Sequence, residues 1–257
     1  AVGSTVYVGT NGGVSISPDG GATWTNSTSG LGSAMVRAVY AVGSTVYAAT
    51  DGGLGISTDG GANFNNRTTV QGLGDNGVRD VYAVGSTVYA ATNGGLSIST
   101  DGGANFNNRT TVQGLGDNVV LDVYALGSTV YAATGGGLSI STDGGANFLN
   151  RIVADGLPSA TQRSVYVVGG DVYAGTLGGL GISTDGGENF ISRTTANGLG
   201  NNDVNDVFVV GNAVYLATQD GISISSSCGT ISSDSSDSSD SGGGTDPGIF
   251  LNVAGPV

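Results

Sequence analysis

The chain of 257 residues contains no histidine and no lysine, and it has a single glutamate, Glu188, and a single cysteine, Cys228. Without histidine it lacks the usual general base near neutral pH and the commonest zinc ligand. Without lysine, Schiff-base catalysis is excluded. The lone cysteine excludes an internal disulfide and leaves either a free thiol or a link to another chain. We therefore expect neither a catalytic site nor a cofactor.

Positive charge is also scarce, since seven arginines stand against twenty acidic residues and the formal net charge is −13. Such a chain repels nucleic-acid phosphates and anionic membrane surfaces. No segment is apolar over the roughly 18 residues that a membrane span needs, and no signal peptide opens the sequence. Because residues 1–10 already belong to a repeat, we expect a processed, secreted product with no nucleic-acid binding and no membrane insertion.

What the chain has in abundance is glycine, at 49 residues, together with β-branched residues and tyrosine. Helix-favouring leucine, glutamate, lysine and glutamine are scarce, which nearly excludes helices. Alignment of the chain with itself places five aspartates at steps of 40 and then 42 residues, beginning at Asp19. The sequence is therefore a tandem repeat of six units of about 42 residues.

Each unit predicts four short strands. In the clearest copy they cover residues 78–84, 87–92, 96–99 and 105–110, and glycine-containing turns separate the first three. Runs such as Val-Tyr-Ala-Ala suit strands that are buried on both faces. Four such strands form one blade, so we predict an all-β, six-bladed β-propeller. A parallel β-solenoid is the main competing fold, but its coils are usually shorter.

The first strand type is complete in only five of the six units, because residues 1–3 retain only its end. A short apolar stretch at the C-terminus, residues 249–255, ends like the missing strand and includes Ile249, Phe250, Leu251 and Val253. We expect it to close the seam of the ring by completing the first blade of its own chain, or to enter a neighbouring molecule. The predicted organisation is a propeller at 1–225, a Ser/Asp/Gly-rich connector at 226–248 and a terminal strand at 249–257.

The turn after the third strand carries a recognisable motif. Residues 17–24 read SPDGGATW, and residues 57–64, 99–106, 141–148 and 183–190 repeat the pattern with Phe for Trp and Asn for Thr; the sixth copy has lost the aspartate. The motif resembles the Asp-box, S-x-D-x-G-x-T-W, of sialidases, sortilin-type receptors and bacterial surface propellers. The Gly-Leu-x-x-x-x-Val segments are similar to propeller repeats of bacterial two-component sensors. Together these resemblances cover residues 1 to about 225, and they imply that the motif aspartates stabilise hairpin turns: Asp19, Asp59, Asp101, Asp143 and Asp185.

Sialidase activity is the sharpest function that the Asp-box resemblance suggests, but the residues do not support it. The family needs an arginine triad, a tyrosine nucleophile beside a glutamate, and an acidic proton donor. Here the arginines recur at two repeat-related positions, and Glu188 replaces a turn alanine. The remaining acid–base candidates are Asp75, Asp80 and Asp122, near predicted strand ends, which are more simply interpreted as solvated loop aspartates.

Two further patterns concern modification and metal binding. Asn-x-Ser/Thr sequons occur at Asn26, Asn66 and Asn108, on or beside the fourth strand, and are candidate glycosylation sites. The connector alternates serine pairs with Asp234, Asp237 and Asp240. It is interpreted as a flexible linker, with calcium binding by these aspartates as the alternative.

By elimination we predict a non-enzymatic, extracellular structural or adhesive module, such as a subunit or decoration of a cell-surface filament. Its expected partners are further copies of itself or another surface or filament protein. A glycan-binding propeller is the alternative, although Trp24 is the only tryptophan for stacking on sugars. An Asp-box glycosidase is the third hypothesis.

Overall fold

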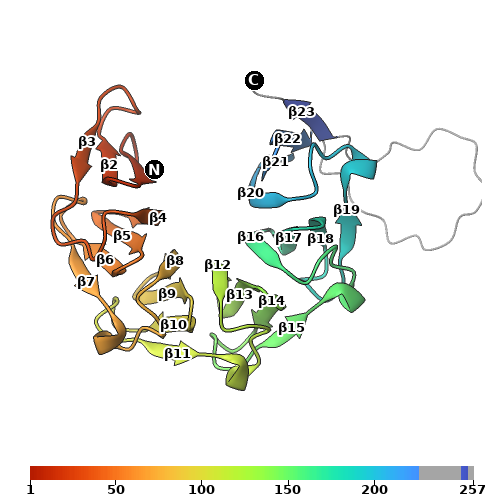
Figure 1. Cartoon of the computed structure of the whole chain (residues 1–257), viewed down its shortest axis with the longest axis horizontal. Helices are drawn as coiled ribbons and strands as arrows, with labels where there is room; N and C mark the ends of the chain where they lie inside the picture. Colours follow the sequence, from red (N-terminus) through yellow and green to blue (C-terminus); the bar gives the residue numbers. More distant parts are fainter. Residues whose placement is uncertain (226–249, 254–257) are drawn as a thin grey trace, which may run out of the picture. The chain divides into compact units, whose positions relative to one another are not determined.

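The computed structural model describes residues 1–225 and 250–253. The chain divides into two compact units, Ala1–Arg151 and Ile152–Val257, each built from antiparallel sheets of consecutive strands. Figure 1 shows the strand order within each sheet. We number the sheets as blades in chain order.

The first unit holds blades 1 to 4, and blade 1 has three strands where the others have four. Blade 1 therefore lacks its first strand, as predicted. The strands of blades 1 and 2 are β1 (Val6–Thr10), β2 (Gly13–Ser17), β3 (Thr25–Ser27), β4 (Val36–Val42), β5 (Thr45–Thr50), β6 (Gly53–Ser57) and β7 (Asn65–Arg67). Those of blades 3 and 4 are β8 (Val78–Val84), β9 (Thr87–Thr92), β10 (Gly95–Ser99), β11 (Asn107–Arg109), β12 (Val120–Leu126), β13 (Thr129–Thr134), β14 (Gly137–Ser141) and β15 (Leu149–Arg151).

The second unit holds blades 5 and 6, each with four strands. Their strands are β16 (Gln162–Val168), β17 (Asp171–Thr176), β18 (Gly179–Ser183), β19 (Ile191–Arg193), β20 (Val204–Val210), β21 (Ala213–Thr218), β22 (Gly221–Ser225) and β23 (Phe250–Val253). The described segments thus form six blades, in agreement with the predicted count.

Two-residue turns and bulges shape every complete blade. In blade 3, Val84 pairs with Thr87, so Gly85 and Ser86 alone form the hairpin between β8 and β9. Near the start of β8 the register shifts between Val78 and Asp80, which leaves the intervening residue as a β-bulge. The same shift occurs in β4, β12, β16 and β20. A bulge redirects the side chain of its extra residue, and this residue is an arginine in three blades.

The core lies between neighbouring blades rather than inside one sheet. We call the face of a blade that packs on the following blade its trailing face, and the opposite side its leading face. Where blade 3 meets blade 4, Tyr89 and Leu96 of the trailing face pack on Val130 and Phe148 of the leading face. Equivalent clusters join blades 1 and 2, blades 2 and 3, and blades 5 and 6. The second strand of a blade such as β9 is buried on both faces, as its sequence predicts.

Helix is limited, in the described segments, to four single turns of 3₁₀-helix after the fourth strands: η1 (Thr69–Gln71), η2 (Thr111–Gln113), η3 (Val153–Asp155) and η4 (Thr195–Asn197). At η1 the backbone N–H of Thr68 donates to Gln71 Oε1 over 2.9 Å, and the N–H of Val70 donates to Thr68 Oγ1 over 3.3 Å. This reciprocal capping fixes the turn that carries the chain to the next blade. Among the described residues, no helix is long and apolar enough to cross a membrane.

The C-terminal strand is not where the sequence placed it. Strand β23 pairs antiparallel with β22, with Ile222 opposite Val253 and Ser225 opposite Phe250, and it is thus the fourth strand of blade 6. We predict that residues 249–255 complete the first blade of their own chain or enter a neighbouring molecule; the strand does complete a blade of its own chain, but that blade is blade 6. Because β23 completes the blade that precedes it in the chain, closure of the seam by this strand is not confirmed.

Candidate functional site

The Asp-box turns are held together by their own side chains. In blade 2, Ser57 donates to Asp59 Oδ1 over 2.7 Å and accepts the backbone N–H of Gly61 over 2.8 Å. Asp59 also accepts the backbone N–H and the side-chain amide of Asn63, both over 3.0 Å. Corresponding bonds surround Asp19, Asp101, Asp143 and Asp185. Each of these carboxylates is thus bonded several times within its own turn, which accounts for it without a ligand.

These bonds favour the ionised carboxylates. Bonds from the side chain and backbone of Thr23, and from Ser17, lower the pKa of Asp19 to about 2. The backbone N–H of Asn63, followed by Ser57 and the Asn63 amide, lowers the pKa of Asp59 to about 2. The pKa of Asp101 is lowered in the same way. The turns are therefore most stable when their aspartates are charged.

We expect the fold to lose stability as the pH falls below about 4, near the ordinary aspartate pKa. The pKa of Asp59 falls from 3.8 to about 2, so the unfolded chain takes up protons first on acidification. The contribution of the turns is thus complete above pH 4 and is lost as the pH falls toward 2. Circular dichroism melts from pH 7 to pH 2 measure this as a falling Tm. The Asp59→Asn variant should melt lower than wild type at pH 7 and show a smaller acid effect, whereas a wild-type Tm that stays constant to pH 2 would contradict the prediction.

One set of repeat-related arginines links neighbouring blades. Arg67, at the end of β7, donates from Nε to the carbonyl of Gly103 over 2.8 Å, in the Asp-box turn of the following blade. Arg109 does the same to Gly145 over 2.9 Å. These guanidinium groups are therefore used to join one blade to the next. They do not converge on a single anion, as a sialidase triad would.

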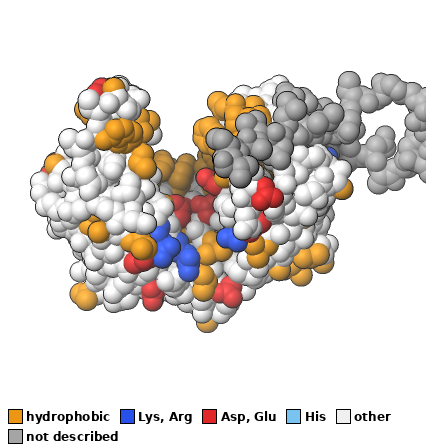
Figure 2. Space-filling model, turned by 45° about the horizontal axis from the view of Figure 1, so that its top comes forward, with side chains coloured by type: hydrophobic (Ala, Val, Ile, Leu, Met, Phe, Trp, Pro, Cys, Tyr) orange, Lys and Arg blue, Asp and Glu red, His pale blue; other side chains and the backbone are white. Residues whose placement is uncertain are grey.

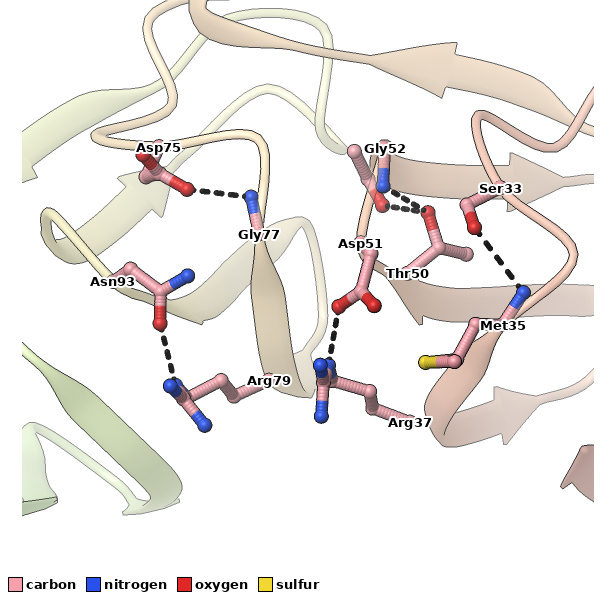
Figure 3. Close-up of polar contacts among 11 residues, drawn as sticks. Ser33, Met35, Arg37, Thr50, Asp51, Gly52, Asp75, Gly77, Arg79 and Asn93 are labelled. Atoms are coloured by element: carbon pink, nitrogen blue, oxygen red, sulfur yellow. Dashed lines mark hydrogen bonds and ion pairs between the residues drawn. The ribbon is translucent and has the colours of Figure 1, made fainter. Parts of the chain in front are cut away.

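The second set of arginines lies at the bulges of the first strands. Figure 3 shows that Arg37 forms an ion pair with Asp51, on the turn between β5 and β6. The neighbouring Arg79 donates from Nε to the neutral amide oxygen of Asn93 over 2.6 Å. In the second unit Arg163 pairs with Asp203, with Nε and Oδ1 2.8 Å apart. The bulge thus directs each arginine toward a polar loop side chain.

The structure brings together two of the three predicted acid–base candidates. The backbone N–H of Val123 lies 3.1 Å from Asp80 Oδ2 and 2.8 Å from Asp122 Oδ1, so these carboxylates from β8 and β12 share one donor. Asp75 is bonded instead to the N–H of Gly77 over 2.7 Å. Within the described residues, no group of three or more His, Cys, Asp or Glu side chains is placed to hold a metal ion.

Aromatic side chains form a column along the first strands of the first unit. The ring centroids of Tyr40 and Tyr82 lie 4.8 Å apart, and those of Tyr82 and Tyr124 also lie 4.8 Å apart. Burial, reinforced by the neighbouring tyrosines, raises the pKa of Tyr82. In the second unit Tyr166 packs edge-on against Phe208 at 5.5 Å. Sequence periodicity does not show that these rings meet across blades.

A polar cavity of about 420 Å³ lies between blades 2 and 3. Its polar lining includes Asp59, Asn63, Asn65 and Arg67. Asp59 and Asn63 are bonded to each other in the Asp-box turn, and Arg67 is bonded to Gly103. The cavity therefore follows from the repeat geometry, and it is also a candidate site for a polar ligand.

The sequon asparagines are bonded within the fold. The Nδ2 atom of Asn66 donates to the carbonyl of Gly52 over 2.8 Å, and that of Asn108 donates to Gly94 over 2.7 Å. Asn26 makes the corresponding bond to Gly12 over 2.6 Å. Since a glycan would be attached to this nitrogen, glycosylation of the folded chain would have to break these bonds.

Several predicted sites lie outside the described residues: Cys228, the candidate calcium ligands Asp234, Asp237 and Asp240, and Ile249. The other residues named for the seam, Phe250, Leu251 and Val253, are part of β23.

Exposed apolar side chains are scattered over the surface (Figure 2), but blades 1 and 6 also expose residues at positions that the other blades bury. On the leading face of blade 1, Trp24 is 46% exposed and Val8 is 42% exposed, whereas Phe64, which is equivalent to Trp24, is 6% exposed. On the trailing face of blade 6, Tyr215 is 37% exposed and Ile222 is 51% exposed. The residues equivalent to Ile222 in blades 2, 3, 4 and 5 are completely buried. Repeat periodicity assigns all of these residues to the core, and sequence reasoning therefore missed both faces.

Comparison with known proteins identifies the fold. No family model and no curated protein matches the sequence. The extracellular domain of a hybrid two-component system from B. thetaiotaomicron is similar over 86% of this chain and 32% of its own, with a TM-score of 0.67 and 18% identity. An ancestral GH74 enzyme is similar over 86% of this chain and 34% of its own, with a TM-score of 0.66 and 20% identity. YCF48, solved with a D1 peptide, is similar over 88% of this chain and 75% of its own, with a TM-score of 0.63 and 20% identity.

The chain spans about a third of the length of the first two proteins. At these identities the similarity shows the fold alone. Together with the six blades, it makes the chain a tandem-repeat β-propeller.

Proposed function

We propose that this propeller is a non-enzymatic structural or adhesive module that acts outside the cell by presenting blade surfaces to other proteins. The observation that carries this proposal is the exposure of apolar side chains, such as Trp24 and Ile222, at positions that the other blades bury. On each of these blades two such side chains share one face, Val8 with Trp24 and Tyr215 with Ile222, and exposed apolar patches are characteristic of interaction sites. A role as a subunit or decoration of a cell-surface filament is the simplest use of such a module.

The polar side chains support the non-enzymatic part of the proposal. The Asp-box aspartates accept bonds from N–H and hydroxyl groups of their own turns, and Arg67 and Arg109 each donate to the following blade. These groups have the same partners in successive blades, whereas a single active site normally departs from the repeat. Residues used in the same way in successive units are best explained as parts of the scaffold.

The extracellular location is supported by structural similarity. The domain from B. thetaiotaomicron is extracellular, and so is a second similar domain from the same organism, at a TM-score of 0.65.

Glycan binding is the second candidate, because the cavity between blades 2 and 3 has a polar lining that could bond to hydroxyl groups. The side chains of Asn63, Asn65 and Arg67 line this cavity, which has a volume of about 420 Å³. The exposed apolar faces favour protein association over this alternative, since neither face contributes to the cavity.

The purified chain should turn over no glycoside and bind no glycan. The test is a panel of fluorogenic glycosides, including a sialoside, together with a glycan array at high protein concentration. Turnover that Asp80→Asn abolishes and Glu188→Gln preserves would overturn the proposal in favour of an enzyme that uses the Asp80–Asp122 pair. Array binding that Arg67→Ala abolishes, in a variant that keeps the wild-type Tm to within a few degrees, would overturn it in favour of a lectin.

A further inference from the structure

We propose that the chains associate head to tail, with the leading face of blade 1 in one copy packed on the trailing face of blade 6 in a second copy. The inference rests on the proposed function, and it names the partner as a second copy of this chain.

The first argument is that the two faces are the halves of an interface that the chain already forms. Between blades 3 and 4, Tyr89 and Leu96 pack on a leading face that contains Val130 and Phe148. The repeat places Tyr215 and Ile222 of blade 6 at the positions of Tyr89 and Leu96. In the same way it places Val6 and Trp24 of blade 1 at the positions of Val130 and Phe148. Blade 6 thus carries the trailing half of the interface and blade 1 carries the leading half.

The second argument is burial. Ile222 and Trp24 are 51% and 46% exposed, whereas Leu96 is completely buried and Phe148 is 9% exposed. Val8, at the position of the completely buried Ala132, is 42% exposed. A second copy would cover on each face the residues that neighbouring blades cover elsewhere, and burial of apolar side chains from water is the main driving force for association.

Charge and shape determine what kind of association follows. The apolar side chains named above are uncharged, but Asp206 of blade 6 occupies the position of Asp80, whose carboxylate reaches Val123 of the following blade. Each copy also carries a net charge of −13, so copies repel one another at long range. Salt screens that repulsion, and association should strengthen as the salt concentration rises.

Blade 1 lacks a first strand, so the contact is smaller than one inside the chain and should be reversible. Because the two faces differ, each joined copy keeps one face free, and assembly continues as a filament or closes as a ring.

Trp24 makes the leading face directly observable. It is the only tryptophan of the chain, so its fluorescence reports on this face alone. As the protein concentration rises from about 1 to about 200 μM, a range that brackets micromolar association, the weight-average mass in sedimentation should rise above the monomer. Over the same range Trp24 emission should shift to the blue and its quenching by acrylamide should decrease.

Two single-face variants test the polarity. Val8→Asp places a charge on the leading face, and Ile222→Asp places one on the trailing face; both positions are half-exposed in one copy, so both variants should fold. Each alone should remain monomeric, while a 1:1 mixture should give a dimer and nothing larger, because one intact face of each kind is left. The matched control is Val70→Asp on η1, which is 86% exposed and lies on neither face; it should assemble like wild type.

Three outcomes would overturn the inference. The first is a wild-type chain that stays monomeric over the whole concentration range at high salt. The second is a wild-type monomer whose Trp24 emission is already shifted to the blue. The third is a mixture of the two variants that fails to dimerise although each variant melts like wild type. None of them changes the glycoside assay, and turnover there would leave head-to-tail association intact. The two proposals can therefore fail separately.

Discussion

Replacing Leu96 by alanine should lower the free energy of unfolding by about 2–5 kcal/mol, the usual range for a buried leucine. Leu96 lies on β10 and is completely buried on the trailing face of blade 3. It packs in one cluster with Val120 of blade 4 and with Leu115 of the connection before it, so the alanine leaves a cavity between blades that two rigid sheets cannot close. Urea denaturation of the purified variant, monitored by circular dichroism, measures the loss.

The matched control is Ile222→Ala at the equivalent position of blade 6. Because Ile222 is 51% exposed, its truncation should cost about 1 kcal/mol or less in dilute solution. The difference between the two variants measures what a following blade contributes. Equal losses at a concentration where the chain is monomeric would show that the trailing face of blade 6 is already covered, in conflict with its exposure in the structure.

The strands of the first hairpin are predictable from sequence because their pattern and their turns agree. Residues 78–84 and 87–92 were expected to be strands, and β8 and β9 have these bounds. The fourth strand is shorter than expected: residues 105–110 were predicted, and β11 covers Asn107–Arg109. Side-chain bonding by Asp101 extends the Asp-box turn to Asn105, and Thr110 caps η2. Local bonds of this kind compete with strand pairing, and hydrophobic periodicity does not report them.

The placement of the C-terminal strand could not be derived from its pattern. Strand β23 is only four residues long, FLNV, and blade 1 offers the edge strand β1 just as blade 6 offers β22. Pairing with β1 and pairing with β22 differ in the side-chain contacts across the sheet and in the length of the loop that must close. Because the entropy of loop closure changes only slowly with loop length, the length of the connector does not decide between them. The similarity of its last residues to a first strand therefore misled the prediction, whereas the structure pairs it with β22.

The partners of the arginines and the exposed faces of blades 1 and 6 could not be predicted from the repeat alone. The arginine positions were visible as repeats, but their partners depend on the bulge that turns Arg37 toward Asp51 and on the neighbouring blade that offers Gly103 to Arg67. The exposed faces have a fainter sequence signal: Trp24 replaces Phe, and Ile222 replaces Leu. A repeat shows what each position packs against in the middle of an array, but not that the end units lack a neighbour.

Replacing Gly72 by alanine should be about as damaging as the loss of a core leucine. Gly72 ends η1 with a φ of 95°, and an added Cβ would lie 2.1 Å from the carbonyl oxygen of Phe106 in the following blade. The two segments are held together there, because the N–H of Phe106 donates to the carbonyl of Gln71 over 2.7 Å. Relief of the clash must break this bond or separate blades 2 and 3. Backbone strain and overpacking together predict a loss of about 3–5 kcal/mol, measured by urea denaturation.

The matched control separates the clash from the strain. Gly102 also has a positive φ, 74°, but an added Cβ would meet nothing within 4 Å. Gly102→Ala should therefore cost only the strain of a left-handed alanine, about 1–2 kcal/mol. If both variants lost the same amount, contact between η1 and the next blade would contribute nothing to stability. A larger loss for Gly72→Ala means that successive blades are held together by backbone approach, which requires glycine, as well as by apolar packing and arginine bonds.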